Sequence, residues 1–262
     1  ESVGIYRGYQ GMIEGDIVPM SARDVHHIIQ KGGTILKSTN GDSFSVAHTV
    51  ANADRTEIAV SKTNKDVIYV LASRYRAGLD PLFQKTTNGF VSATAFTGPQ
   101  DADTGIPNTD FTRGQQWYDL VIEVDPIDDT KIYAGGIDLF RSTDSGTNWK
   151  QISKWSNNNN LAGLNIPLVH ADQHGWAFHP TDPDKAVIGN DGGVYYASSL
   201  LGAETTTTAI AARNRDYNVT QFYHGEIGQN ASFEILLAGA QDNGTQFVEN
   251  AAAGVNGTQD GY

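Results

Sequence analysis

The sequence predicts an all-β protein: a partial β-propeller of about four blades, preceded by a short α/β segment. From residue 39 onward, short runs rich in Val, Ile, Tyr and Phe alternate with turn residues, and the chain holds 28 glycines. A frame of strand, turn, strand, Gly, strand and turn recurs along this part of the chain. A hairpin-turn motif follows several of the expected strands. Together these observations favour a series of small antiparallel sheets.

The repeated frame is clearest in LVIEVDPIDDTKIYAGGIDLFRSTD and GWAFHPTDPDKAVIGNDGGVYYASS, with looser copies on either side. Corresponding strands near Tyr69, Tyr133, Ile188 and Leu237 are separated by 64, 55 and 49 residues. Periods of roughly 40–50 residues are typical of propellers, in which neighbouring blades cover each other's apolar faces. The expected strands are, in chain order, Glu57–Val60, Val67–Ala72, Leu120–Val124, Lys131–Gly135, Gly175–Phe178, Ala186–Gly189 and Phe233–Ala238.

The hairpin-turn motif is complete once, in RSTDSGTNWK at residues 141–150. The side chains of Ser142 and Asp144 can accept backbone N–H groups inside the turn, and Gly146 allows a positive φ angle. Trp149 is expected to pack its ring beneath the hairpin. Weaker copies read STNG at 38–41 and TTNG at 86–89. The motif resembles the Asp-box (BNR repeat) of sialidase-like, sortilin-like and xyloglucanase-like propellers, and the resemblance implies a structural role on the rim.

Residues 1–38 follow a different pattern from the rest of the chain. Residues 1–37 carry four basic and four acidic side chains, so the net charge of −12 arises entirely from residues 38–262. A helix is expected from Ser21, a good N-cap, to Lys31, with Ile28 and Ile29 at helical spacing. Gly32 and Gly33 would end that helix, and a short strand from Thr34 to Leu36 would follow. Strand–helix–strand order is typical of α/β proteins.

The same segment carries a specific resemblance. Residues 4–38, with GIYRGYQGMIEG and GGTILKS, resemble a near-N-terminal piece of bacterial 6-phosphofructokinase. The resemblance implies that Tyr9 would lie near an ATP adenine. This chain has Thr39 and Asn40 where the family has an Ala-Arg pair, and the family's phosphate loop and catalytic aspartate motif are missing. We therefore expect two joined, unrelated domains, 1–38 and 39–262, with no kinase activity and no cofactor.

The strongest candidate site is the stretch VHADQHGWAFHP. His170, Asp172 and His174 alternate, so on a strand all three would point to one face. Two imidazoles and a carboxylate on one face could contact a ligand, perform acid–base chemistry or bind a divalent metal. They could also form a hydrogen-bonded ladder that lines the channel of the propeller. Ligand contact without a metal is the role we assign.

Two aspartates follow corresponding strands, Asp191 in GNDGGVYYAS and Asp242 in GAQDNGTQF. Equivalent places in successive blades project onto one face, and a carboxylate pair there could cleave a glycosidic bond. Alternatively, both residues form Asx turns before a glycine. The aromatic residues Trp117, Tyr118 and Trp176 could stack on sugar rings or fill the core between blades. This combination resembles xyloglucanase-type glycoside hydrolases, although Asp191 lacks one residue of that family's DxGGxY-like spacing.

Composition excludes several classes of function. The chain has no cysteine, so it has neither disulfides nor thiolate metal sites. Its charge of −12 and lack of a basic stripe argue against nucleic acid as a partner. No apolar run approaches the roughly 20 residues that span a bilayer, so no membrane insertion is expected.

The resemblance implies a secreted or bacterial cell-surface protein. We expect a propeller that binds a polysaccharide or protein ligand without turnover and that needs the remaining blades of an intact propeller as partners. The alternative is a glycoside hydrolase that uses Asp191 and Asp242. An inactive piece of 6-phosphofructokinase is a third, weaker alternative.

Overall fold

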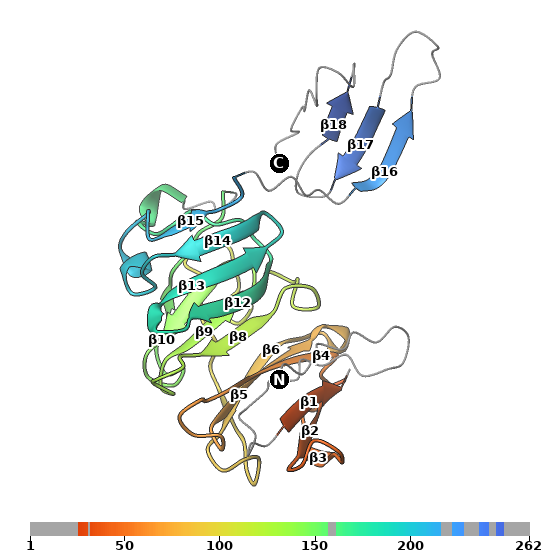
Figure 1. Cartoon of the computed structure of the whole chain (residues 1–262), viewed down its shortest axis with the longest axis vertical. Coiled ribbons are helices and arrows are strands. Elements are labelled where there is room, and N and C mark those ends of the chain that lie inside the picture. The colour runs from red at the N-terminus through yellow and green to blue at the C-terminus, as the bar shows by residue number, and fades with distance from the viewer. Residues whose placement is uncertain are drawn as a thin grey trace.

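The computed structural model describes residues 26–30, 32–156, 161–215, 222–227, 236–240 and 245–248. Within these residues the protein consists almost entirely of antiparallel sheets, joined by turns and three short 3₁₀ helices (Figure 1). No helix among them is long and apolar enough to cross a bilayer.

Three sheets have four strands each, and consecutive strands pair with one another. They comprise β4 (Arg55–Val60), β5 (Ile68–Arg74), β6 (Leu79–Thr86) and β7 (Thr94–Phe96); β8 (Val121–Val124), β9 (Ile132–Gly135), β10 (Leu139–Ser142) and β11 (Lys150–Gln151); and β12 (Gln173–His179), β13 (Asp182–Asn190), β14 (Gly193–Ala197) and β15 (Ile210–Ala212). Two further sheets have three described strands: β1 (His26–Gln30), β2 (Thr34–Ser38) and β3 (Ser45–Thr49), and β16 (Phe222–Ile227), β17 (Leu236–Ala240) and β18 (Thr245–Val248). The 3₁₀ helices are η1 (Tyr75–Ala77), η2 (Leu161–Gly163) and η3 (Gly202–Glu204).

This architecture confirms the predicted partial propeller. Tyr69, Tyr133, Ile188 and Leu237, which mark the sequence period, lie in β5, β9, β13 and β17, the second strands of four successive sheets. The first strands β4 and β12 both contact β8, so the first strand of each four-stranded sheet lies on the inside of the array.

Apolar side chains between successive sheets form three cores. Ile35 packs with Ile58 and Ile68, which joins the β1–β3 sheet to the β4–β7 sheet. A second core joins β4–β7 to β8–β11, and a third joins β8–β11 to β12–β15. Tyr69 and Tyr133 are fully buried within these layers. Each sheet therefore relies on its neighbour to remove its apolar face from water.

The predicted helix from Ser21 to Lys31 is wrong at its described end, where His26–Gln30 forms strand β1. Strand β1 pairs antiparallel with β2, and Ile29 lies opposite Ile35. Neighbouring β-branched residues suit a strand, and pairing with a sheet overrides a weak helical pattern. Gly33 turns the chain at φ +86°, and a Cβ atom there would lie 2.6 Å from the carbonyl oxygen of Val50.

The predicted boundary at residue 38 falls inside one sheet, because β2 pairs with β3 across it. The α/β segment is thus built into the first sheet of the array as an all-β element within the described residues. Where one domain ends and the next begins remains a prediction.

The turn between β10 and β11 contains the complete hairpin motif. The Ser142 hydroxyl donates to Asp144 Oδ1 at 2.9 Å and accepts the backbone N–H of Gly146 at 2.9 Å. Asp144 Oδ1 also accepts the backbone N–H of Asn148, which lowers the pKa of the Asp144 carboxyl. The Trp149 ring lies against Phe83, with centroids 5.7 Å apart.

Two other turns between third and fourth strands, or their equivalents, repeat this bonding. The Thr86 hydroxyl accepts the N–H of Phe90, four residues later, as Ser142 does with Gly146. Ser38 accepts the N–H of Gly41, only three residues later. The first turn is therefore one residue shorter than the other two.

We expect Ser142→Ala to lower the free energy of unfolding by about 1–3 kcal/mol, because the buried N–H of Gly146 loses its acceptor. Ser142→Thr, which reproduces the hydroxyl present at Thr86, is the matched control and should stay close to wild type. Urea unfolding measures both. Equal stability of the alanine and threonine variants would contradict the role given to the hydroxyl.

Candidate functional site

Most of the described candidate site residues lie at one end of the sheets. Successive antiparallel strands alternate in direction, so the start of each first strand lies at the same end as the turn between the second and third strands. Helix η1, the residues just before β8, the residues just before β12 and the β13–β14 turn therefore share this end. The turn that contains Asp144 lies at the opposite end, away from Asp191.

The long connection from β7 to β8 is held by an ion cluster. Arg113 lies 2.7 Å from Asp101, 3.2 Å from Asp138 and 3.7 Å from Asp103. The three carboxylates are almost completely buried, and the arginine side chain is 14% exposed. Because Asp138 belongs to the β9–β10 turn, the cluster ties this connection to the sheet next to the site.

Two rings of this connection lie between rings of η1 and β12, and together they form what we call the aromatic row: Tyr75, Trp117, Tyr118 and His174. Successive ring centroids are 6.5, 5.5 and 4.7 Å apart, and the last pair is edge-to-face. Trp117 is 53% exposed and Tyr75 is 51% exposed. The row thus forms a continuous aromatic surface from η1 to the start of β12.

Asp191 lies at the end of this row. The Tyr118 hydroxyl lies 3.1 and 3.0 Å from its two carboxylate oxygens, and His174 Nε2 lies 2.6 Å from Oδ1. The Asx turn expected here is made instead by Asn190, whose Oδ1 accepts the N–H of Gly192 at 3.0 Å. The Asp191 carboxylate therefore forms hydrogen bonds to the side chains of Tyr118 and His174 instead of a turn, and 12% of its side chain is exposed.

A second carboxylate lies beneath the row. Asp119 is fully buried, and neither of its carboxylate oxygens has a hydrogen-bond partner among the described residues. Burial first, and then the negative charge of Asp172, raise the pKa of Asp119 to about 9. Arg55 donates to the backbone oxygens of Tyr118 and Leu120 on either side. Asp119 is thus held as a neutral acid in a position fixed by its neighbours.

His170, Asp172 and His174 do not line one strand face as expected. Strand β12 begins only at Gln173, and Asp172 has a left-handed backbone with φ +63°. The His170 ring lies before the strand begins, and its Nδ1 lies 3.1 Å from the carbonyl oxygen of Ala171. Of the three, His174 joins the aromatic row, while Asp172 accepts a long bond from Gln115, and its negative charge acts on Asp119.

Trp176 lies away from this surface. Its ring packs 5.0 Å from Tyr133 and 5.7 Å from Phe178, in the core between the β8–β11 and β12–β15 sheets. Asp242 and Tyr9 lie outside the described residues. Across the described part of the chain, no three His, Asp or Glu residues stand close enough to hold a metal together.

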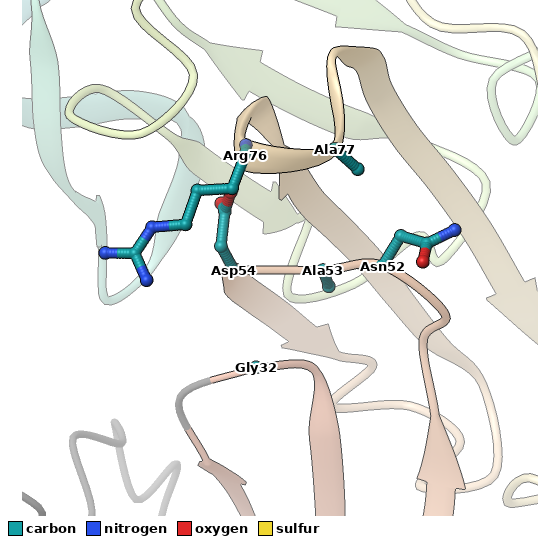
Figure 2. A pocket seen from close by; sticks show the side chains of 6 residues that line it. All are labelled: Gly32, Asn52, Ala53, Asp54, Arg76 and Ala77. Carbon is teal, nitrogen blue, oxygen red and sulfur yellow. The ribbon is translucent and has the colours of Figure 1, made fainter.

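A shallow pocket of about 420 Å³ opens at the same end, where the first sheet meets η1 (Figure 2). The residues that line it are Gly32, Asn52, Ala53, Asp54, Arg76 and Ala77. Asp54 accepts the backbone N–H of Arg76 at 2.7 Å, and Figure 2 shows the Arg76 side chain extending away from Asn52 and Ala77. The pocket adjoins the aromatic row through η1, which carries both Tyr75 and Arg76.

Sequence reasoning missed Asp119 and Arg113. Asp119 directly follows the aromatic pair in GQQWYDL and comes just before an apolar strand, as Asp54 does before β4. That repeated position is a signal that a comparison of the repeats could find. Arg113 gives no such signal, because its three partners are 10, 12 and 25 residues away.

The Phosphofructokinase family model matches residues 1–72 of the chain. ATP-dependent 6-phosphofructokinase 1 of Thermus thermophilus is 54% identical over 44 residues, which are 17% of this chain and 14% of that protein. The enzyme of Brevibacillus brevis is 35% identical over 130 residues, 48% of this chain and 38% of that protein. The chain thus spans well under half of the length of these relatives.

Solved structures similar to this one include two glycoside hydrolases. An ancestral GH74 enzyme matches with a TM-score of 0.52 and 15% identity, covering 93% of this chain and 37% of that one. Niastella koreensis GH74 matches with the same score and identity, covering 96% of this chain and 38% of that one. At this identity the similarity concerns the fold. The chain is a partial β-propeller with a short phosphofructokinase-like segment at its N-terminal end.

Proposed function

We propose that the protein is an extracellular or cell-surface propeller that binds a polysaccharide at the aromatic row without cleaving it. The observation that carries this proposal is the pair of half-exposed rings, Trp117 and Tyr75, beside Asp191 and His174. Aromatic faces suit stacking on sugar rings, and a carboxylate and an imidazole suit hydrogen bonds to hydroxyl groups.

The surroundings of the carboxylates support binding without turnover. Both oxygens of Asp191 already face the Tyr118 hydroxyl, and one of them faces His174. Asp119, the protonated carboxyl in the same region, is buried out of reach of a ligand on the surface. The phosphofructokinase-like segment contributes strands to the first sheet in this proposal and no catalysis.

We expect Trp117→Ala to weaken polysaccharide binding at least tenfold, because truncation of an aromatic ring that serves as a binding hot spot costs about 2 kcal/mol or more. The first probe is xyloglucan, followed by cellulose and chitin oligosaccharides, with binding measured by calorimetry. Val91→Ala is the matched control, since Val91 is 87% exposed on the β6–β7 turn at the opposite end. Absence of binding by the wild type, or equal affinity of the two variants, would contradict the proposal.

A glycoside hydrolase is the alternative, favoured by the GH74 fold neighbours and by the Asp191–His174 contact. The two functions separate in one assay, the release of reducing ends from the polysaccharide that binds. The proposal expects none from the wild type. Release by the wild type that is lost in Asp191→Asn would instead establish a hydrolase.

A further inference from the structure

Gln116 joins the two elements that carry the exposed rings of the aromatic row. Trp117 belongs to the connection before β8, whereas Tyr75 belongs to η1, in the turn between β5 and β6. The side-chain amide of Gln116 accepts the backbone N–H of Arg74 at 2.8 Å and donates to the backbone oxygen of Leu79 at 2.9 Å. Arg74 and Leu79 lie directly opposite each other, at the end of the pairing between β5 and β6. One side chain thus bonds to both strands at the base of the turn that carries Tyr75.

The bonds of this amide fix the turn against the connection. Gln116 is only 4% exposed, and a buried amide that loses its partners is costly, so both bonds are held firmly. Each element is also fixed on its own. Arg55 donates to the backbone oxygen of Leu120 in the connection, and Asp54 accepts the backbone N–H of Arg76 in the turn. Gln116 therefore sets the position of one fixed element relative to the other.

Successive rings of the aromatic row are tilted against one another. The angle between ring planes is 51° for Tyr75 and Trp117, 43° for Trp117 and Tyr118, and 77° for Tyr118 and His174. A ring stacks on a sugar with its plane parallel to the face of that sugar. The flat face of an insoluble polysaccharide presents its sugars in one plane, so it cannot stack on two such rings at once. A single chain in solution can rotate successive sugars about their glycosidic bonds and follow the tilt.

We propose that Gln116 is a positioning residue of the aromatic row: it fixes the tilt between Tyr75 and Trp117, and that tilt restricts the row to single polysaccharide chains. The proposal rests on the proposed function, the binding of a polysaccharide at this row. Gln116 acts through the two rings, because its own amide is engaged by the backbone of the β5–β6 turn. Rings that are fixed before the ligand arrives lose little freedom on binding, which favours affinity.

The first test compares soluble and insoluble forms of the same polysaccharides. Cellohexaose and chitohexaose have the sugars and linkages of cellulose and chitin powders, but only the powders present flat faces. The wild type should bind at least one soluble probe, xyloglucan included, with at least tenfold higher affinity than either powder, in calorimetry and depletion assays. Equal binding to a powder would refute the restriction to single chains and leave the proposed function standing. Absence of binding to every soluble probe would contradict both.

The second test is a double-mutant cycle on the soluble probe that binds most tightly. Gln116→Met removes both hydrogen bonds at similar side-chain length and should weaken binding at least fivefold. Gln84→Met is the matched control and should not change binding, since Gln84 lies 3.0 Å from His48 Nε2, elsewhere on β6. In a Tyr75→Ala background, Gln116→Met should weaken binding less than twofold, because Gln116 acts by placing Tyr75. An equal loss in both backgrounds would indicate a general loss of stability and would overturn the positioning role.

The third measurement needs no ligand. Gln116→Met frees the N–H of Arg74, so hydrogen exchange of this amide should be at least tenfold faster than in the wild type. Gln84→Met should leave the exchange rate of the same amide unchanged. Unchanged exchange in Gln116→Met would show that the turn is held without this side chain, and the positioning role would then be wrong whatever the protein binds.

Discussion

Arg113→Met is expected to lower the free energy of unfolding by about 3–5 kcal/mol, the usual effect of removing one partner from a buried ion pair. The substitution leaves the carboxylates of Asp101, Asp103 and Asp138 buried together without their cation. Methionine keeps a similar unbranched shape, so the loss reflects charge and hydrogen bonds more than packing. Urea unfolding followed by circular dichroism measures the change.

Two controls separate this effect from a general loss of positive charge. Arg113→Lys keeps the charge but cannot bond to several carboxylates as a planar guanidinium does, so an intermediate loss is expected. Arg76→Met removes an exposed arginine at the same end of the protein and should change stability by less than about 0.5 kcal/mol. A stability of Arg113→Met equal to that of Arg76→Met would contradict the buried cluster.

The same cluster should also affect binding. Arg113 holds the connection that carries Trp117 and Tyr118, and it does so from outside the aromatic row. Under conditions where Arg113→Met is still folded, polysaccharide affinity should fall along with local order. The side chain that holds the connection in place, Arg113, is therefore different from the exposed rings that would contact the ligand.

The fold was predictable because its information is local and repeated. Short apolar runs, turn residues and a recurring frame place strands β5, β8 and β9 within one or two residues of their observed bounds, whereas β13 begins four residues before its predicted start. The failure at His26–Gln30 has the opposite cause. Its helical pattern is real, but pairing with Thr34–Ser38 in a sheet decides the outcome, and a sequence pattern cannot weigh a partner strand against a helix.

The site was predictable only in part, because its contacts are long-range. Asp191 and Tyr118 were each marked by their neighbours in sequence, yet 73 residues separate them. The alternation of His170, Asp172 and His174 assumed a strand, and the left-handed backbone at Asp172 breaks it. The place of Asp119 just before an apolar strand marks the residue, but no local pattern indicates that its carboxyl is buried near the negative charge of Asp172.

Asp119→Asn is expected to stabilise the protein at neutral and alkaline pH by several kcal/mol. Burial and the charge of Asp172 raise the pKa of Asp119 to about 9, from 3.8 when the carboxyl is free in water. Each pKa unit corresponds to about 1.4 kcal/mol. At pH values above the pKa of the unfolded state, this shift therefore lowers the free energy of unfolding of the wild type by several kcal/mol. Asparagine is uncharged and has nearly the shape of the protonated acid, so it fills the same buried position without that loss of stability.

The pH dependence gives the sign of the effect. Between about pH 4 and pH 9 the folded state keeps the Asp119 proton while the unfolded state has lost it, so wild-type stability falls as the pH rises through this range and this contribution levels off above it. The advantage of Asp119→Asn should therefore grow from pH 5 to pH 9 in urea unfolding.

Asp128→Asn is the control of opposite sign, because the Thr130 hydroxyl lowers the pKa of Asp128 and the ionised form is the favoured one. That variant should gain nothing at any pH. An advantage of Asp119→Asn that stays constant across the range would show that Asp119 is ionised in the folded protein, with a cation or water that satisfies its oxygens. A neutral, unpaired acid beside the aromatic row lowers the stability of the folded protein. Strongly shifted pKa values of this kind are found most often at sites of binding or catalysis.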